Sequence, residues 1–274
     1  KFLFARMSEP QGPAWNNQQS DWPGVDPVLA GDGPALQKMY AHAWHWHRGD
    51  GVGVSRSDGR EAGELLQALE SGDERIGIAA AYELAACGEE VVPSVLGKLA
   101  DENEMVRRHA AYALSAMGGV AVAGLTEALM CDEAVTRAEA ATILGDIGLA
   151  AGSAVPALIA ATKDEHEEVR CRACEALGTV SQHSPVAAPA LIAALADESV
   201  AVRTAATFAL CRLGPQAAEA VAALEQVLDD ENRYVRADAL YALERIGTSL
   251  AKDALIKHLM PARWCPITTP ESTF

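Results

Sequence analysis

The sequence has few aromatic residues, no long apolar run and no excess of positive charge. Only 5% of its 274 residues are aromatic, whereas 50% are apolar. No uninterrupted apolar run approaches about 18 residues, so no membrane-spanning helix is predicted. The formal net charge of −16 argues against binding to a phosphate backbone, which requires a basic surface. We therefore expect neither a nucleic acid nor a membrane as partner.

The six cysteines do not follow the spacing of a disulfide framework or a zinc site. Cys171 and Cys174 stand close together, but at positions that other copies of a repeat fill with packing residues. We therefore interpret them as part of a helix rather than as a redox pair. Lys1 stands first, and no cationic segment followed by an apolar core marks a secretory signal. These features predict a reducing, cytoplasmic location.

The sequence does contain a repeated phrase. Its anchor is an arginine, and successive anchors are 30, 33, 33 and 33 residues apart: Arg107, Arg137, Arg170, Arg203 and Arg236. A period in this range is typical of one supersecondary unit stacked on its own copies. Counting from each anchor, residue +3 is alanine, residue +7 is leucine and residue +10 is apolar. These offsets lie on one side of an α-helix and predict its buried stripe.

A second apolar helix is expected between consecutive phrases. Glycine at +11 in four of the five copies is typical of a left-handed helix stop. An aspartate six residues before most anchors predicts the N-cap of the next long helix. Each unit is therefore interpreted as two antiparallel helices whose apolar faces are covered by neighbouring units. A sixth, degraded unit stands at the front, where Gly77 replaces the anchor arginine.

The anchor arginines are interpreted as structural. Each follows an acidic loop, and we expect each to pair with an aspartate of its own or of the adjacent loop. Such a ladder of ion pairs would fix the register between units.

The Asp, Val-Arg, Ala-Ala and Leu-Gly marks at this spacing resemble the HEAT-like repeats of the phycobilin lyase type, from about Glu64 to Met260. The resemblance implies an all-α solenoid of about six helical-hairpin repeats. Proteins of this kind serve mostly as scaffolds and adaptors. A phycobilin lyase-like factor that handles a chromophore stays open as an alternative function.

Three regions are predicted along the chain. Residues 1–60 form an irregular arm rich in Trp and Pro, with a short helix near residues 35–48. Residues 61–260 form the solenoid, and residues 261–274 form a capping tail. Within the arm, His42, His45 and His47 are weak candidates for metal ligands, because His47 does not share a helical face with the other two and no supporting acidic or cysteine ligand is near.

Residues 1–15 resemble the segment that follows the catalytic core of phytanoyl-CoA dioxygenase-like proteins. This resemblance implies a second alternative, in which the chain is the C-terminal part of an Fe(II)/2-oxoglutarate oxygenase whose catalytic domain lies outside it. The iron ligands of that family cannot be assigned to any residue here, because no His-x-Asp motif occurs and a facial triad needs one or its His-x-Glu equivalent on a β-core.

A candidate binding surface follows from the fifth residue after each anchor. It is aromatic in four of the six units and points about 160° away from the buried stripe, at 100° per residue. We expect this ladder to line the concave face of the solenoid, although tyrosine covering an alanine-rich surface is an equal alternative. With neighbouring residues, the predicted partner-binding set is Tyr82, Arg108, His109, Tyr112, Arg172, Phe208, Arg212, Tyr241 and Arg245.

The sequence thus predicts a non-catalytic interaction or scaffold module. Aromatic and arginine side chains are the usual anchors of protein interfaces, so we expect the partner to be a protein or a domain of the same larger polypeptide. We find no catalytic constellation and predict no cofactor.

Overall fold

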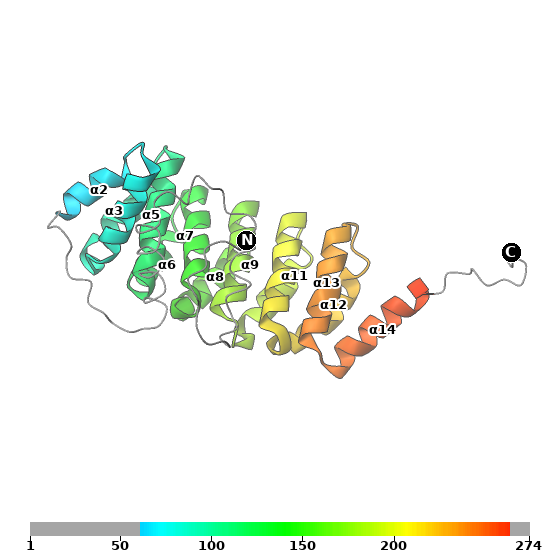
Figure 1. Ribbon diagram of the computed structural model, residues 1–274. Helices are drawn as coiled ribbons and strands as arrows, with labels where there is room; N and C mark the ends of the chain where they lie inside the picture. Colours follow the sequence, from blue (N-terminus) through cyan, green and yellow to red (C-terminus); the bar gives the residue numbers. More distant parts are fainter. Residues whose placement is uncertain (1–60, 264–274) are drawn as a thin grey trace, which may run out of the picture. The chain divides into compact units, whose positions relative to one another are not determined.

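The computed structural model describes residues 61–263, which form six helical hairpins and one further helix (Figure 1). The first helices of the hairpins are α2 (Ala62–Leu69), α4 (Val92–Leu96), α6 (Val122–Ala128), α8 (Val155–Ala161), α10 (Ala188–Ala194) and α12 (Val221–Val227). The second helices are α3 (Glu74–Ala85), α5 (Glu104–Met117), α7 (Ala134–Ile147), α9 (Glu167–Val180), α11 (Val200–Leu213) and α13 (Arg233–Ile246). The final helix, α14, spans Ser249–Arg263.

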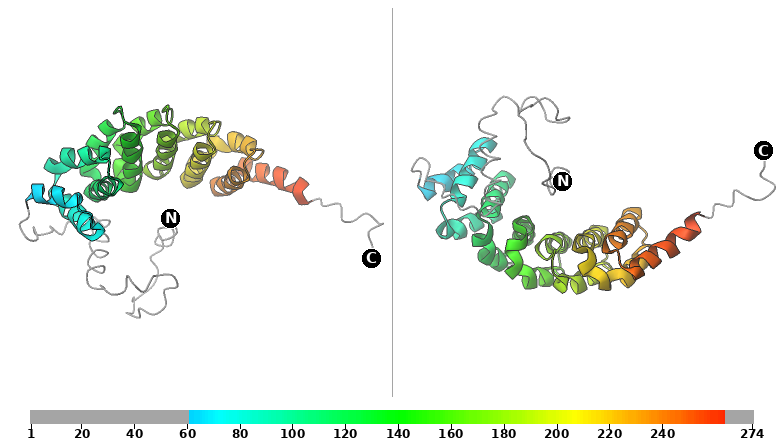
Figure 2. Two further views of the ribbon diagram at one scale, coloured as in Figure 1. Left: turned by 90° about the horizontal axis from the view of Figure 1, so that it is seen from above. Right: turned by 60° about the horizontal axis from the view of Figure 1, so that its bottom comes forward.

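The hairpins stack side by side in the order of the sequence. Each first helix packs on the second helix of its own hairpin, and each second helix packs on the second helix of the next unit. The views in Figure 2 show the resulting two layers, with the mostly longer second helices on one side and the shorter first helices on the other. The predicted all-α solenoid is confirmed.

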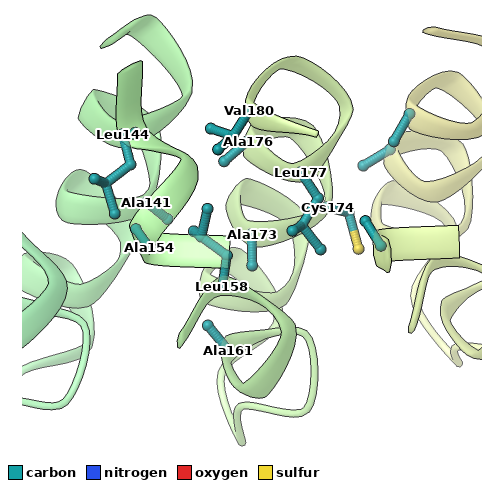
Figure 3. Close-up of a cluster of buried hydrophobic side chains, with 14 of the residues drawn as sticks. Ala141, Leu144, Ala154, Leu158, Ala161, Ala173, Cys174, Ala176, Leu177 and Val180 are labelled. Atoms are coloured by element: carbon teal, nitrogen blue, oxygen red, sulfur yellow. The ribbon is translucent and has the colours of Figure 1, made fainter. Parts of the chain in front are cut away.

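One continuous hydrophobic core lies between the two layers of helices. Every alanine at +3 and every leucine at +7 is fully buried, as the period predicted. Figure 3 shows how Leu144 of α7, Leu158 of α8 and Leu177 of α9 are surrounded by alanines in this layer. Small residues set the spacing of the second helices: a Cβ added to Gly178 would lie 2.8 Å from the Cα of Ala209. Alanine and glycine therefore allow α9 and α11 to approach closely.

The stretch Ala134–Ala161 is long and apolar enough by composition to cross a membrane, but it folds as a hairpin. Gly148 ends α7 with φ of +69°, a short 3₁₀ segment follows, and α8 returns across the layer. Only glycine adopts such a φ without strain. Ala140, Leu144 and Leu158 are fully buried in the core, whereas Val135 and Leu149 are exposed.

The aspartates six residues before the anchors do not cap the long helices, which corrects the prediction. The N-cap of α9 is His166 and that of α11 is Ser199, each two residues after the aspartate. The aspartate instead accepts a hydrogen bond from the N-cap backbone: the N–H of Ser199 donates to Oδ1 of Asp197 over 2.8 Å. This hydrogen bond holds the carboxylate just before the first turn of the helix, where it faces the preceding unit.

Two predicted regions lie wholly or largely outside the described residues. They are the arm of residues 1–60, with its expected helix near residues 35–48 and its candidate ligands His42, His45 and His47, and the tail after residue 263. The similarity of residues 1–15 to the oxygenase family lies in the same arm. At the other end, α14 continues to Arg263, three residues past the predicted end of the solenoid at residue 260.

Candidate interaction surface

At one position of the repeat, four second helices carry a large exposed aromatic side chain. The exposed fractions are 43% for Tyr82, 42% for Tyr112, 47% for Phe208 and 52% for Tyr241. Their common position in the repeat explains this, because the opposite side of each helix carries the buried alanine and leucine stripe. We call these four residues the aromatic ladder.

The two repeat units between Tyr112 and Phe208 carry polar residues instead of aromatic ones. At the equivalent positions α7 carries Thr142 and α9 carries Glu175, and both are half-buried. The hydroxyl of Thr142 donates to the carbonyl of Ala138 in its own helix. The ladder therefore consists of one aromatic pair on α3 and α5 and another on α11 and α13, with a polar segment between them.

Arginines accompany both aromatic pairs. Arg108, Arg212 and Arg245 are exposed, as expected for candidate contact residues. The guanidinium of Arg212 lies over the ring of Phe208, 5.9 Å from its centroid, which is within the range of a cation–π contact. These side chains present amphipathic surface, the kind that interface anchors offer.

Arg172 belongs to the polar segment and is already engaged. It is half-buried, and its Nη1 donates to Oε2 of Glu175 over 3.1 Å. Its Nη2 lies 3.7 Å from Oε1 of Glu168, one turn earlier on α9. A partner that used Arg172 would have to share it with these two carboxylates.

The prediction for His109 is wrong. Its side chain is fully buried rather than exposed, and its Nδ1 lies 3.0 Å from the carbonyl oxygen of Leu69. The reason lies in the preceding unit, because the imidazole fills the space beside Gly77, where a Cβ would collide with the ring. The absence of an anchor arginine at Gly77 thus turns His109 into a core residue.

Burial raises the pKa of three carboxyl groups on the second helices, Glu139, Asp146 and Asp238. For Glu139, Arg107 and Arg172 oppose this increase. Desolvation disfavours the charged form of a carboxyl group, so this surface gains from any partner group that donates to these oxygens.

The anchor arginines form the predicted ladder of ion pairs, and three rungs have the same geometry. In the first, Nε of Arg137 donates to Oδ2 of Asp164 over 2.7 Å and Nη2 donates to Oδ1 over 2.9 Å. Its Nη1 donates to two carbonyls of its own loop, those of Cys131 and Asp132. The other two rungs are Arg170–Asp197 and Arg203–Asp230.

These rungs perturb the titration of their carboxyl groups. Burial alone would raise the pKa of Asp164, but the Arg137 guanidinium and the His166 backbone N–H outweigh it and lower the pKa below its ordinary value. The same balance lowers the pKa of Asp197 and Asp230. The anchor arginines of this part of the chain are therefore structural, and the surface available to partners lies elsewhere.

The closely spaced cysteines do not form a reactive pair. Cys174 is fully buried in the layer between α9 and α11, and burial, followed by the effect of Cys171, raises the pKa of its thiol to about 12. A thiol that stays protonated is a poor nucleophile and a poor metal ligand. Within residues 61–259, where side chains are described, His, Cys, Asp and Glu do not gather in groups of three that could hold a metal ion.

Comparisons with known proteins agree with this architecture. A family model described as HEAT repeats matches residues 63–135, 122–211 and 188–263. Among solved structures, the complex of CpcE and CpcF of phycocyanin lyase from a Nostoc species is similar with a TM-score of 0.51 and 24% identity, over 56% of this chain and 98% of that one. At this identity the likeness concerns the fold.

Designed proteins are also among the similar solved structures. A designed armadillo repeat protein in complex with the peptide (KR)4 is similar with a TM-score of 0.47 and 20% identity, over 68% of this chain and 100% of that one. An engineered protein gives the same TM-score and identity over 69% and 97% of the respective chains. No curated protein matches the chain by sequence.

Proposed function

Because this chain belongs to the family of HEAT-repeat proteins, we propose that it is a non-catalytic scaffold that binds a protein partner along the concave side of its stacked helices. The binding face is the outward side of the second helices, from α3 to α13. The observation that carries the proposal is the aromatic ladder, in which one repeat position holds four large aromatic side chains that are each 42% to 52% exposed.

Chemistry supports a protein as the occupant of this face. Exposed aromatic side chains supply large apolar area with little conformational entropy to lose, and recurrent ones are a feature of interaction surfaces. Arg108, Arg212 and Arg245 stand beside them and can donate to backbone carbonyls or carboxylates. Because the four rings follow the row of helices, an extended segment of the partner fits the surface better than a small molecule does.

The proposal is tested with a partner identified by photo-crosslinking from position 112, followed by affinity measurement with the purified pair. Tyr112→Ala combined with Tyr241→Ala removes one ring from each aromatic pair and is expected to weaken binding about 100-fold or more, since hot-spot truncations contribute about 2 kcal/mol each. The matched control is Leu149→Ala with Val186→Ala, which removes exposed apolar side chains outside the ladder and leaves binding unchanged.

The competing interpretation is that the rings only cover alanine-rich helix surface. In that case the Tyr112→Ala, Tyr241→Ala variant loses stability in urea unfolding but binds the identified partner with wild-type affinity, and the proposed face is wrong. The structure adds no support to either of the two alternative functions. The oxygenase alternative rests on residues outside the described part, and the similarity to phycocyanin lyase concerns the fold alone.

A further inference from the structure

The ladder of ion pairs has a gap between the second and third hairpins. Arg107, the anchor of α5, donates from Nη1 to the carbonyl of Asp101 over 2.8 Å and to that of Glu102 over 3.1 Å. The anchors of the three intact rungs make the same two bonds with their own loops. The guanidinium of Arg107 is thus held in the orientation that receives a carboxylate elsewhere in the chain.

Among residues 61–259, whose side chains the structure describes, no carboxylate forms an ion pair with Arg107. The residue six positions before the next anchor is aspartate in the intact rungs and Cys131 here. The thiol of Cys131 donates to the backbone carbonyl of Glu133, 3.5 Å away. Nε of Arg107, which would donate to the aspartate, is buried and has no hydrogen-bond partner in the described part of the chain. A buried charged donor without an acceptor is unfavourable, and such groups are normally satisfied.

A cavity lies at this gap. Its volume is about 450 Å³, which is within the range of small ligand sites, and it is lined by Leu99, Ala100, Asp101, Arg107, Glu133, Ala134 and Val135. Four of the seven lining residues are aliphatic, and the other three are Arg107, Asp101 and Glu133. Helices α5 and α7 also pack less closely along their length than α7 and α9 do, which leaves room between the two loops.

The two acidic residues of the wall do not exclude an anion. Asp101 already accepts from the backbone N–H of Asn103 over 2.9 Å, and Glu133 accepts from the hydroxyl of Thr136 over 3.2 Å. An intact rung also has a second carboxylate nearby, since Glu165 lies 4.0 Å from Nη2 of Arg137 beside the bound Asp164. A carboxylate at Arg107 would likewise lie beside acidic loop residues.

We propose that this cavity binds an aliphatic carboxylate, whose charged group completes the interrupted rung on Arg107 and whose hydrocarbon part lies against Leu99, Ala134 and Val135. The carboxylate replaces the aspartate that Cys131 does not provide and accepts from Nε and Nη2 as a bidentate pair. Two sources share this chemistry: a free branched-chain acid, and the C-terminal residue of a peptide that ends in an aliphatic side chain. The site is separate from the aromatic ladder and does not depend on it.

The test follows the arginine Nε–Hε resonances of the full chain by NMR, with assignment of the Arg107 signal from the Arg107→Lys variant. The wild-type protein is titrated with 3-methylbutanoate and, in a matched series, with its neutral amide. We expect a saturable shift of the Arg107 signal with the acid and none with the amide. Acetyl-Gly-Val with a free carboxylate is the peptide arm, and tighter binding of this peptide than of the acid identifies a partner's C-terminus as the natural source.

Cys131→Asp is the decisive variant, because it supplies the carboxylate from within the chain. It is expected to keep the fold and to weaken binding of both acids at least about tenfold, which corresponds to about 1.4 kcal/mol. Cys87→Ser, which alters an exposed cysteine outside the cavity, serves as the matched control with unchanged affinity. Absence of a saturable shift with either acid, equal response to the amide, or unchanged affinity of Cys131→Asp would each overturn the proposal. If Cys131→Asp does not fold, Arg107→Lys is compared with wild type through the backbone amide signal of Val135 in the pocket wall, and loss of the saturable shift is expected because lysine cannot bind a carboxylate in the same bidentate way.

Discussion

The rear and the front of the solenoid hold their hairpins together in different ways. From α7 to α13, three arginine–aspartate rungs join consecutive units, and in each the two side chains have exposed fractions of 13% or less. From α3 to α7 no such rung exists within the described residues: Gly77 stands where an anchor would be, and Cys131 stands where an aspartate would be. At the front, the ring of His109 packs against Gly77, and an exposed ion pair between Lys98 and Glu70 joins the first two hairpins.

The difference shows that the same repeat can fix its register by charge or by packing. An ion pair with bidentate geometry fixes the orientation of both side chains and depends on their charges. A packed imidazole tolerates very little change of volume, since its space is defined by a missing side chain in the neighbouring unit. The rear should therefore respond to loss of charge and to acid, and the front to changes of volume.

The largest effect is expected from the central rung. Arg170→Ala leaves Asp197 partly buried without its partner and should reduce the free energy of unfolding by about 3 kcal/mol, as for other broken buried pairs. Arg107→Ala is the matched control at the front, where only two carbonyl bonds are lost, and should reduce it by about 1 kcal/mol. Urea unfolding at neutral pH measures both, and equal losses would remove the distinction between the two regions.

Acid should abolish the advantage of the intact rung. The pKa of Asp197 is lower in the folded protein than its ordinary value, so the rung contributes its full stabilisation above the unfolded-state pKa of about 3.9. As the pH falls through the lower, folded-state pKa, the carboxylate is protonated and this contribution is lost. The difference between wild type and Arg170→Ala should accordingly shrink in the same pH range.

The second effect concerns volume at the front. Gly77→Ala places a Cβ against the buried ring of His109 and should destabilise the protein by about 2 kcal/mol, as overpacking of a tight site does. Gly63→Ala, on an adjacent helix where nothing lies within 4 Å of the new atom, should be neutral or stabilising by up to about 1 kcal/mol. Adding His109→Ala to Gly77→Ala should recover part of the loss in a double-mutant cycle.

Much of this fold could be predicted from the sequence, because the same residue recurs at each buried position in five copies of the repeat. The alanine at +3 and the leucine at +7 are the same in every full copy, and all are buried. The rungs were also predictable in kind, since an arginine and an acidic loop recur at a fixed interval. Which loop each arginine reaches was not, because that depends on how neighbouring hairpins are offset in space.

The candidate site was only partly predictable, for a related reason. Helical-wheel arithmetic places Tyr112 and Phe208 on an exposed side, and they are exposed. The same arithmetic could not show that His109 is covered, because its cover comes from a gap in another unit. The cavity at Arg107 likewise results from two departures from the repeat, Cys131 in one unit and the looser packing of α5 on α7. A signal was present in the sequence: Cys131 is the loop position where the aspartate is missing.

The third expected effect is an increase in stability. Cys131→Asp should build a fourth rung with Arg107 and stabilise the protein by about 1.5 kcal/mol at neutral pH, the scale of a hydrogen bond to a charged group. Cys131→Asn, which has a similar size and no charge, is the matched control and should give less than half of that gain. Thermal unfolding followed by circular dichroism measures both variants. If Cys131→Asp were no more stable than Cys131→Asn, an arginine–aspartate rung could not be built at the front as it is at the rear.

The smallest expected effect concerns a carboxylate whose influence on stability changes with pH in the opposite direction to that of the rung aspartates. Burial raises the pKa of Asp238 in the folded protein, so its charge opposes folding at neutral pH and the opposition disappears as the pH falls through the folded-state pKa toward the unfolded value of about 3.9. Asp238→Asn should therefore stabilise the protein by about 0.5 kcal/mol at pH 7 and have no effect near pH 3. Glu219→Gln, an exposed carboxylate with its side chain in solvent, is the control and should leave stability unchanged at both pH values. A gain for Asp238→Asn that persisted in acid would assign the effect to the amide's hydrogen bonds, and the contrast between stabilising rung carboxylates and destabilising face carboxylates would fail.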